Sequence, residues 1–390
     1  MSSMKAPSAA ASGPQHGGGA GGAAGVRMRV PVPSLGTIPR PGVSRLLDAA
    51  TTRRLTVVSA GPGWGKSTAV AHWLVSDRSQ RDVPVAWLTL AAIDNHPEAF
   101  WQDVLGAIRA SGALPAGHPL SHASTAGGVP AEVLATLHQG LDALPGPLLL
   151  VLDDFHLIDD ATVIEAVQRL IDHDSPLRLI LLSRIDPTLA LYRLRLAGQV
   201  AELTSLELAF GPGDVERMGR ASSLTLTSED VDQLLVHTEG WPAGVRLATL
   251  YLSRPGRHHE ITQFAGTERS VSEYLLAEVL EANTPQTQDF LLRTAVAGRL
   301  TGDLAEAIVP GSRGQAVLEL LERSNQFVTA LGADRVWFRY HPLLRDMLVH
   351  NLRRDDPPTF AAAHRATATW LATRDPLAAL DHSAAADDWT

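Results

Sequence analysis

The stretch "VVSAGPGWGKSTAV", residues 57–70, decides the fold. It joins a short apolar run at 54–60 to a helical pattern that begins at Lys66. The apolar run has no helical period, which is typical of a strand buried in a parallel sheet. Glycines in the turn let backbone N–H groups point inward around an anion, and the start of the following helix carries partial positive charge. The stretch therefore predicts a phosphate-binding loop between a strand and a helix.

The spacing inside this loop is A-x-x-x-x-G-K-S, with alanine in place of the first glycine of the strict pattern. In such a loop the lysine ammonium contacts the β- and γ-phosphates, and the serine hydroxyl ligates Mg²⁺. The alternative is a glycine-rich strand–helix turn that holds nothing. We expect the nucleotide to be bound along the whole loop, by Ala60, Gly61, Pro62, Gly63, Trp64, Gly65, Lys66, Ser67 and Thr68.

Strand-like runs alternate with helical patterns as far as residue 210. The runs lie at 54–60, 83–90, 147–154, 177–184 and 201–208, and the helical patterns at 97–110, 131–144 and near 160–173. Such alternation predicts a parallel, doubly wound sheet covered on both faces. The expected fold class is therefore an α/β P-loop NTPase.

Two acids end the run at 147–154, and both are candidate catalytic residues. In a P-loop fold that strand ends beside the phosphates. Asp153 is expected to hold Mg²⁺ together with Ser67, and Asp154 to orient an attacking water. The alternative is a helix-capping turn, where aspartate is common.

Arg184 ends the run at 177–184 and is the third candidate catalytic residue. If its strand inserts between the loop strand and the acidic strand, its end faces the γ-phosphate. An arginine there can register whether that phosphate is present. The alternative is a loop arginine that pairs with a nearby acid such as Asp186.

After residue 214 the strand signals fade and the chain becomes mostly helical. Residues 325–350 read as strand, glycine turn, strand and helix, which is typical of a winged helix. An antiparallel helix pair follows Pro358. We expect a disordered leader (1–30), a P-loop NTPase domain (31–210), a helical nucleotide-lid domain (211–268), a winged-helix domain (269–355) and the start of a TPR-like helical arm (356–390).

Composition excludes several classes of function. A net charge of −9 argues against a broad surface for nucleic acid or anionic membrane. The absence of cysteine excludes disulfides, thiolate zinc sites and cysteine catalysis. The apolar run at 148–152 is too short to cross a bilayer, and residues 1–26 lack the apolar core of a signal peptide. These features predict a cytoplasmic protein. The histidines at 258 and 259 are not expected to bind metal, because adjacent residues do not share a helix face.

Taken together, the motifs resemble the STAND class of signalling ATPases, in the branch of the maltose-regulon activator and the large ATP-binding LuxR-type regulators. The resemblance covers about residues 31–385 and rests on "VPVPSLGTIPRPGVSRLLD", "VVSAGPGWGKST", "WLTLAAIDNHPEAFW", "LLLVLDDFHLI", "LLSRIDPTLALYRLRLAGQVAEL", "HTEGWPAGVRLA" and "FRYHPLLRDML".

The resemblance also implies roles for single residues. The Walker A pair is Lys66 and Ser67, the Walker B pair is Asp153 and Asp154, and Arg184 is the sensor-1 arginine. The adenine is expected to contact a Gly-x-Pro turn and an N-terminal segment, and the winged helix to reach the ADP phosphates through a histidine. The Gly-x-Pro turn is formed by Gly240 and Pro242. The N-terminal segment contributes Arg40 and Pro41, and the histidine is His341.

As a function, the resemblance implies a switch gated by ATP and ADP, with slow hydrolysis and with self-association in the ATP state. A small-molecule or protein inducer would bind the helical arm, and DNA a C-terminal helix-turn-helix. The chain ends at Thr390, inside the first helical repeat, so we expect both parts to be missing. One alternative is a P-loop enzyme with fast turnover, such as a small-molecule kinase or a transport ATPase. Another is an inactive scaffold that keeps the fold.

Overall fold

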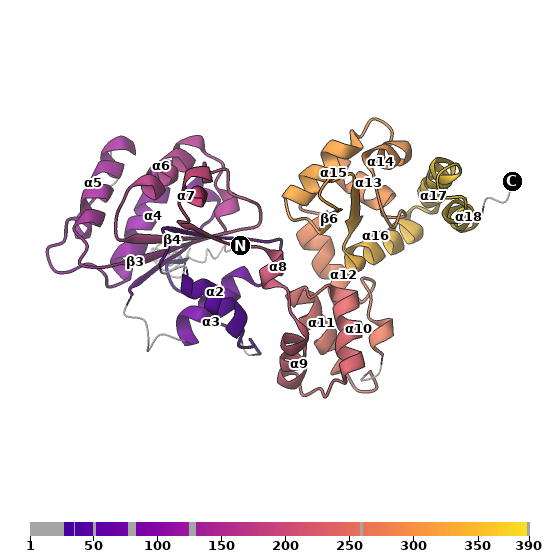
Figure 1. Ribbon diagram of the computed structural model, residues 1–390, viewed down its shortest axis with the longest axis horizontal. Helices are drawn as coiled ribbons and strands as arrows, with labels where there is room; N and C mark the ends of the chain where they lie inside the picture. Colours follow the sequence, from indigo (N-terminus) through magenta and orange to yellow (C-terminus); the bar gives the residue numbers. More distant parts are fainter. Residues whose placement is uncertain are drawn as a thin grey trace, which may run out of the picture.

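The computed structural model describes residues 27–34, 36–49, 52–76, 83–124, 130–257 and 260–387. Most of the expected disordered leader, and the histidines at 258 and 259, lie outside the described residues. Figure 1 shows one lobe built on a sheet and a second lobe that is mostly helical.

The sheet of the first lobe has five parallel strands in the order β2-β3-β4-β1-β5. As expected for the strand that carries Arg184, β4 lies between the loop strand β1 and the acidic strand β3. Since all strands are parallel, their carboxyl ends meet at one edge, where α/β folds bind ligands. The strands are β1 (Leu55–Ser59), β2 (Val85–Thr89), β3 (Leu148–Asp153), β4 (Leu177–Ser183) and β5 (Val200–Leu203).

Helices cover both faces of this sheet (Figure 1). Helices α2 (Pro41–Asp48) and α3 (Lys66–Ser76) pack on one face, and α4 (Pro97–Ala110), α5 (Pro130–Asp142) and α6 (Ala161–Asp172) on the other. Successive residues of a strand point to opposite faces, so Val57 belongs to the core under α4–α6 and Val58 to the core under α2 and α3. The short helices η3 (Ala92–Asn95), η4 (Pro119–Ser121), η5 (Phe155–Leu157) and α7 (Tyr192–Leu196) lie in the connections.

One predicted strand is partly wrong. The run at 201–208 divides into β5 and a short helix, α8 (Ser205–Leu208). The hydroxyl of Thr204 accepts a hydrogen bond from the N–H of Leu206, and the carboxylate of Glu207 accepts one from the N–H of Thr204 at 2.7 Å. This capping box starts a helix where apolar periodicity alone suggests extended chain.

The second lobe begins with three helices, α9 (Pro212–Ala221), α10 (Ser228–Thr238) and α11 (Pro242–Leu252). After η6 (Ile261–Gln263) come α12 (Arg269–Leu275), a π-helical turn η7 (Leu276–Leu280), α13 (Pro285–Thr294), α14 (Gly302–Ile308) and α15 (Gly314–Arg323). The winged-helix pattern is confirmed, with an antiparallel hairpin of β6 (Val328–Leu331) and β7 (Trp337–Tyr340) followed by α16 (Pro342–Asp355).

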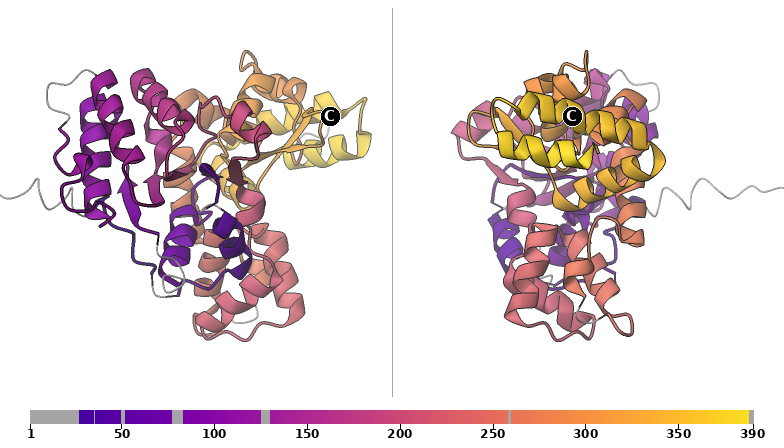
Figure 2. Two further views of the ribbon diagram at one scale, coloured as in Figure 1. Left: turned by 60° about the vertical axis from the view of Figure 1, so that its left-hand side comes forward. Right: turned by 90° about the vertical axis from the view of Figure 1, so that its right-hand side faces the viewer.

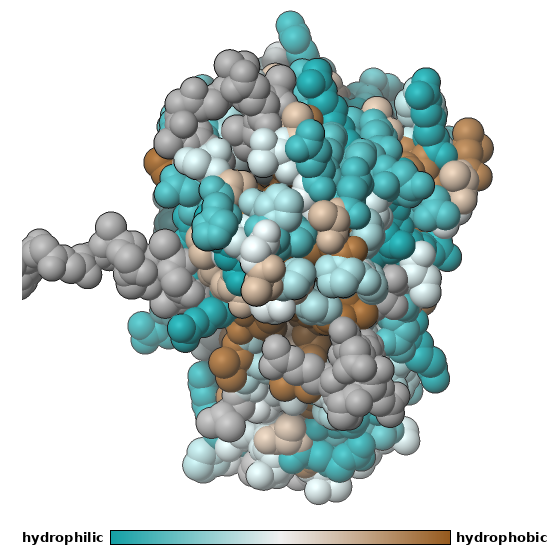
Figure 3. All heavy atoms as spheres, turned by 90° about the vertical axis from the view of Figure 1, so that its left-hand side faces the viewer, coloured by the Kyte–Doolittle hydropathy of each residue, from teal (hydrophilic) through white to brown (hydrophobic). Residues whose placement is uncertain are grey.

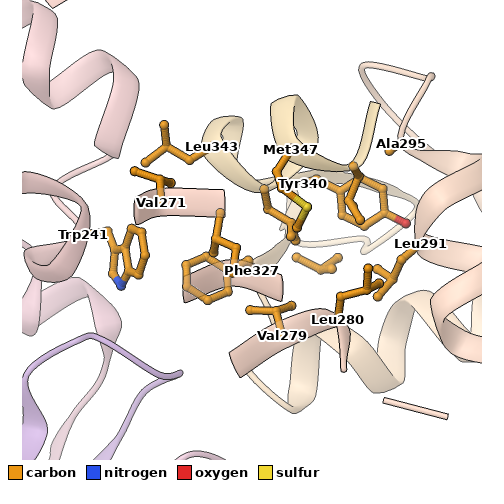
Figure 4. Packing of buried hydrophobic residues seen from close by; sticks show 14 of the residues in the cluster. Trp241, Val271, Val279, Leu280, Leu291, Ala295, Phe327, Tyr340, Leu343 and Met347 are labelled. Atoms are coloured by element: carbon orange, nitrogen blue, oxygen red, sulfur yellow. The ribbon is translucent and has the colours of Figure 1, made fainter. Parts of the chain in front are cut away.

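A single apolar core runs through this lobe, from Phe210 to Ala363. Figure 4 shows part of it, with Trp241 of the helical segment beside Phe327 and Val279 of the winged-helix segment. The helical and winged-helix segments therefore share one core.

The expected helix pair after Pro358 is formed by α17 (Pro357–Leu371) and α18 (Pro376–Ala385), which lie side by side (Figure 2). Figure 3 views the sheet lobe from the left of Figure 1; its upper part is largely hydrophilic, and apolar residues gather in a band below. Within the described ranges, no helix has the length and apolar character needed to cross a membrane.

Candidate nucleotide-binding site

The loop after β1 has the geometry of a phosphate cradle. Gly63 and Gly65 have φ of 73° and 74°, in the left-handed region that glycine adopts without strain. Helix α3 begins directly after them at Lys66. The ammonium of Lys66 is buried under the loop, where it donates to the carbonyl oxygens of Ala60 at 2.6 Å and Gly61 at 3.0 Å. The loop therefore gathers a helix N-terminus, a buried lysine and two glycines in the left-handed conformation in one place.

Ser67 and Asp153 meet beside the loop. The Ser67 hydroxyl donates to Oδ1 of Asp153 at 2.8 Å, and the N–H of Asp154 donates to the same oxygen at 3.0 Å. Burial, followed by the charge of Asp154, raises the pKa of Asp153 to about 6. Burial and the charge of Arg184 lower the pKa of Lys66 to about 8. Burial thus disfavours the charged forms of both side chains. A cation beside Asp153 and an anion beside Lys66 would each stabilise the charged form.

This donor set fits Mg²⁺. The ion commonly uses one or two carboxylates together with substrate phosphates and waters, rather than a cage made only of protein. Ser67 and Asp153 offer a hydroxyl and a carboxylate side by side at the cradle. The described part of the chain holds no group of three or more His, Cys, Asp or Glu residues arranged for a metal.

Asp154 adopts the left-handed conformation, with φ of 58° and ψ of 38°, at the start of η5. Its side chain is 39% exposed and lies 3.8 Å from Nδ1 of His156. Burial lowers the pKa of His156 to about 4, so this imidazole is neutral at pH 7. Asp154 is therefore partly exposed, whereas Asp153 stays buried at the strand end.

Arg184 lies at the end of β4 and is held by the second lobe. Its guanidinium donates to Oε2 of Glu278 at 2.8 Å, and its backbone carbonyl accepts from the side-chain amide of Asn325 at 3.0 Å. The alternative pairing with Asp186 is not the one observed. Asn325 also covers the loop, because a Cβ added to Gly61 would come closer than 3.0 Å to the Asn325 carbonyl oxygen.

A cavity of about 330 Å³ adjoins the cradle, within the size range of small-molecule sites. Three parts of the chain enclose it: the N-terminal segment with the start of α2, the loop with α3, and the second lobe. Its lining is mainly apolar, which suits a purine base and its sugar. The lining residues are Ser34, Gly36, Thr37, Ile38, Arg40, Val43, Ser44, Gly63, Trp64, Gly65, Thr68, Ala69, His72, Phe210, Met218, Pro242, Ala243, Arg246 and Tyr274.

Comparison with known proteins agrees with this geometry. A family model described as the MalT winged helix domain matches residues 276–360. The chain carries a MalT-type winged helix. Over 370 residues, 93% of its length, it is 32% identical to the serine/threonine-protein kinase PknK of Mycobacterium tuberculosis. Over 376 residues it is 30% identical to the HTH-type transcriptional regulator MalT of Yersinia pestis.

The alignments cover 33% and 40% of these relatives, so the chain spans between a third and two fifths of their length. Among solved structures, the Walker-type ATPase PABY2304 of Pyrococcus abyssi has a similar fold, with a TM-score of 0.57 at 15% identity over 80% of this chain and 96% of that one. The α/β P-loop fold followed by a winged helix, and the resemblance to the MalT branch of the STAND ATPases, are thereby confirmed.

Arg40 fixes the N-terminal segment against the start of the second lobe. Its guanidinium donates to the carbonyl oxygens of Leu208 and Ala209, both at 2.8 Å, and lies 4.8 Å from the ring centroid of Phe210. Arg40 thus lines the cavity while joining its two walls. Pro41 begins α2 and is not among the lining residues.

The predicted Gly-x-Pro turn packs directly on the cradle. The indole N–H of Trp241 donates to the carbonyl oxygen of Pro62 at 3.2 Å, and a Cβ on Gly63 would lie 2.7 Å from that nitrogen. Gly240 has φ of 73° and no room for a side chain, because a Cβ there would lie 2.6 Å from the Phe210 carbonyl oxygen. Pro242 lines the cavity, whereas Gly240 acts by allowing the turn.

His341 is not among the residues that line the cavity. Its Nε2 donates to the carbonyl oxygen of Thr238 at 2.8 Å, and its Nδ1 accepts from the N–H of Leu343 at 3.3 Å. The ring is 4% exposed and stacks edge-on against Trp241 and Phe327. Burial lowers the pKa of His341. With both nitrogens hydrogen-bonded, His341 joins the helical and winged-helix segments, and its contact with the ADP phosphates stays a prediction.

Sequence reasoning missed several residues at this site. Tyr274 and Arg246 line the cavity, His156 lies against Asp154, and Glu278 and Asn325 contact the end of β4. His156 stands inside the quoted phrase "DDFHLI" and Arg246 inside "HTEGWPAGVRLA", so those phrases contained a signal. Glu278 belongs to no motif that was recognised, and Asn325 stands at the start of the winged-helix pattern, which assigns it no role at the site.

Proposed function

We propose that this chain is the nucleotide-gated switch of a signalling ATPase, which binds ATP with Mg²⁺, hydrolyses it slowly and retains ADP. The observation that carries the proposal is the docking of the winged-helix segment on the phosphate cradle. Asn325 lies over Gly61, and Glu278 holds Arg184. Product under a docked domain leaves only when that domain moves, and such motions limit turnover in many enzymes.

In this proposal each residue at the strand ends has one task. The cradle and Lys66 bind the β- and γ-phosphates, while Ser67 and Asp153 hold Mg²⁺, which neutralises charge on the phosphates. Asp154 orients a water for attack on the γ-phosphate. Arg184 registers the γ-phosphate. The adenine lies in the apolar cavity between Arg40 and Pro242.

The two relatives support a regulatory module rather than an effector. One is named a protein kinase and the other an HTH-type transcriptional regulator, yet both match almost the whole of this chain. A segment common to a kinase and a DNA-binding regulator is best explained as the part that controls an output made elsewhere. The proposal therefore includes self-association in the ATP state, an inducer that acts through the helical segment after residue 356, and DNA contact through a C-terminal region, all in the cytoplasm.

Hydrolysis kinetics test this function against the alternative of a fast P-loop enzyme. After removal of bound nucleotide, excess Mg²⁺-ATP should give a burst of about one ADP per chain, followed by a much slower steady rate set by release. Lys66→Ala should show no burst. Rapid linear turnover without a burst would support the small-molecule kinase or transport ATPase and overturn the switch.

A further inference from the structure

The partner of Arg184 comes from the opposite lobe. Glu278 lies in η7, between α12 and α13, and its carboxylate accepts a hydrogen bond from the Arg184 guanidinium at 2.8 Å. The two residues are 94 positions apart in the chain. Glu278 of the winged-helix segment therefore forms an ion pair with Arg184, whose guanidinium lies at the carboxyl end of the central strand, beside the cradle.

The backbone around Glu278 is unusual. Residues Leu276–Leu280 form a π-helical turn, in which the N–H of Glu281 donates to the carbonyl oxygen of Leu276 at 2.8 Å. Single π turns are rare and frequently occur at functional sites. The neighbouring side chains of Val279 and Leu280 are buried, so the turn is anchored in the core while Glu278 remains partly exposed.

A second contact holds the same strand end. The side-chain amide of Asn325 donates to the carbonyl oxygen of Arg184 at 3.0 Å and lies 3.4 Å from the hydroxyl of Ser59 on the loop strand. Glu278 is also close enough for its charge to act on the ammonium of Lys66. The winged-helix segment therefore contacts both the side chain and the backbone carbonyl of Arg184. Its Glu278 also places a negative charge near Lys66, where a bound phosphate would place one.

We propose that Glu278 and the γ-phosphate compete for the Arg184 guanidinium, so that binding of a triphosphate breaks the ion pair and frees the winged-helix segment. This inference rests on the proposed function. With ADP the pair stays intact, because ADP has no phosphate to take the arginine. With ATP the γ-phosphate replaces the carboxylate, and one lobe-to-lobe contact is lost.

The strength of the pair suits such an exchange. Arg184 and Glu278 are 37% and 36% exposed and share a single hydrogen bond, and ion pairs of this kind contribute little. A phosphate offers several acceptor oxygens to the planar guanidinium and binds it through two parallel hydrogen bonds. The carboxylate is thus a partner that a phosphate can displace. By reciprocity, the docked winged-helix segment lowers affinity for the triphosphate.

The test compares nucleotide preference in Glu278→Gln and in the matched control Glu281→Gln, an exposed glutamate at the end of the same turn. Dissociation constants for Mg²⁺-ADP and Mg²⁺-AMP-PNP are measured by competition against a fluorescent ADP. The preference of Glu278→Gln should shift by about two- to five-fold toward AMP-PNP, the range expected for loss of one partly exposed ion pair. Glu281→Gln should match the wild type.

The same substitution made in an Arg184→Gln background decides the mechanism. There Glu278→Gln should have no further effect on the preference, because the residue for which the two anions compete is gone. An unchanged preference in Glu278→Gln, or an equal shift in the Arg184→Gln background, would overturn the exchange and leave the proposed function standing. A wild type that binds neither nucleotide would overturn the proposed function and this inference with it.

Discussion

Gly61→Ala isolates the docking of the winged-helix segment from the rest of the site. Gly61 is not among the glycines with positive φ, so alanine fits its backbone conformation. The one obstacle is the Asn325 carbonyl oxygen, which an added Cβ would approach closer than 3.0 Å. The substitution should therefore strain only the arrangement in which the two lobes are docked.

The size of the effect follows from the overlap. The Asn325 backbone must retreat by about 1 Å to restore ordinary contact, and overpacking of this kind costs about 1–3 kcal/mol. Because that cost falls on the docked form, the equilibrium between docked and undocked forms should shift by about 5- to 150-fold. Release of ADP from the docked form should accelerate by a similar factor.

The assay follows a fluorescent ADP chased from the protein by excess unlabelled ADP. Gly146→Ala is the matched control, since a Cβ at Gly146 meets nothing within 4 Å and its φ is not positive. It should release ADP at the wild-type rate. Circular dichroism and thermal unfolding establish that both variants are folded.

An unchanged ADP release rate in folded Gly61→Ala would refute the reasoning, because the contact with Asn325 would then not control access. A folded variant that binds neither ADP nor ATP would refute it in another way. Gly61 would in that case serve the phosphate cradle itself, and the lobe contact would be incidental.

Three further outcomes are expected. Lys66→Ala should abolish nucleotide binding measured by calorimetry, because it removes the cation at the cradle; retained binding would favour the inactive scaffold or another site. Asp153→Asn should stabilise the nucleotide-free protein. The pKa of Asp153 is about 6 in the fold and 3.8 unfolded, so the folded form holds the proton more tightly and wild-type stability falls as pH rises from about 4 to 6. Urea unfolding should show the variant gaining about 3 kcal/mol over the wild type at pH 7.5 and much less at pH 4, and an equal difference at both would contradict the assignment. Trp241→Phe loses the hydrogen bond to Pro62 and should lower the free energy of unfolding by about 1 kcal/mol while weakening ADP binding; unchanged ADP affinity would mean that the turn does not support the cradle.

Much of the sheet lobe could be predicted from sequence because its signals are local. A buried strand, a glycine turn and a helix start are contiguous around Lys66, and the pattern assigns each part a place. The strand order followed for a similar reason, since P-loop folds put the acidic strand and the loop strand on either side of a third. The capping box at Thr204 was also local, but the apolar spacing of 201–208 hid it.

The contacts between lobes could not be predicted in this way. Arg184 and Asn325 are 141 positions apart, and no periodicity relates them. In the sequence, Glu278 is one of several polar residues in a helical pattern, and the neighbouring residues do not predict a π turn. His341 illustrates the converse case, where a resemblance predicted a ligand contact and the local packing uses both ring nitrogens.

The central claim, that this chain retains its product, is tested most directly by its contents after purification. The protein is isolated without added nucleotide, denatured, and the released nucleotide is identified and counted by chromatography. The account predicts ADP at close to one per chain, held under the docked winged-helix segment. An empty site that binds ATP weakly and hydrolyses it rapidly would contradict it.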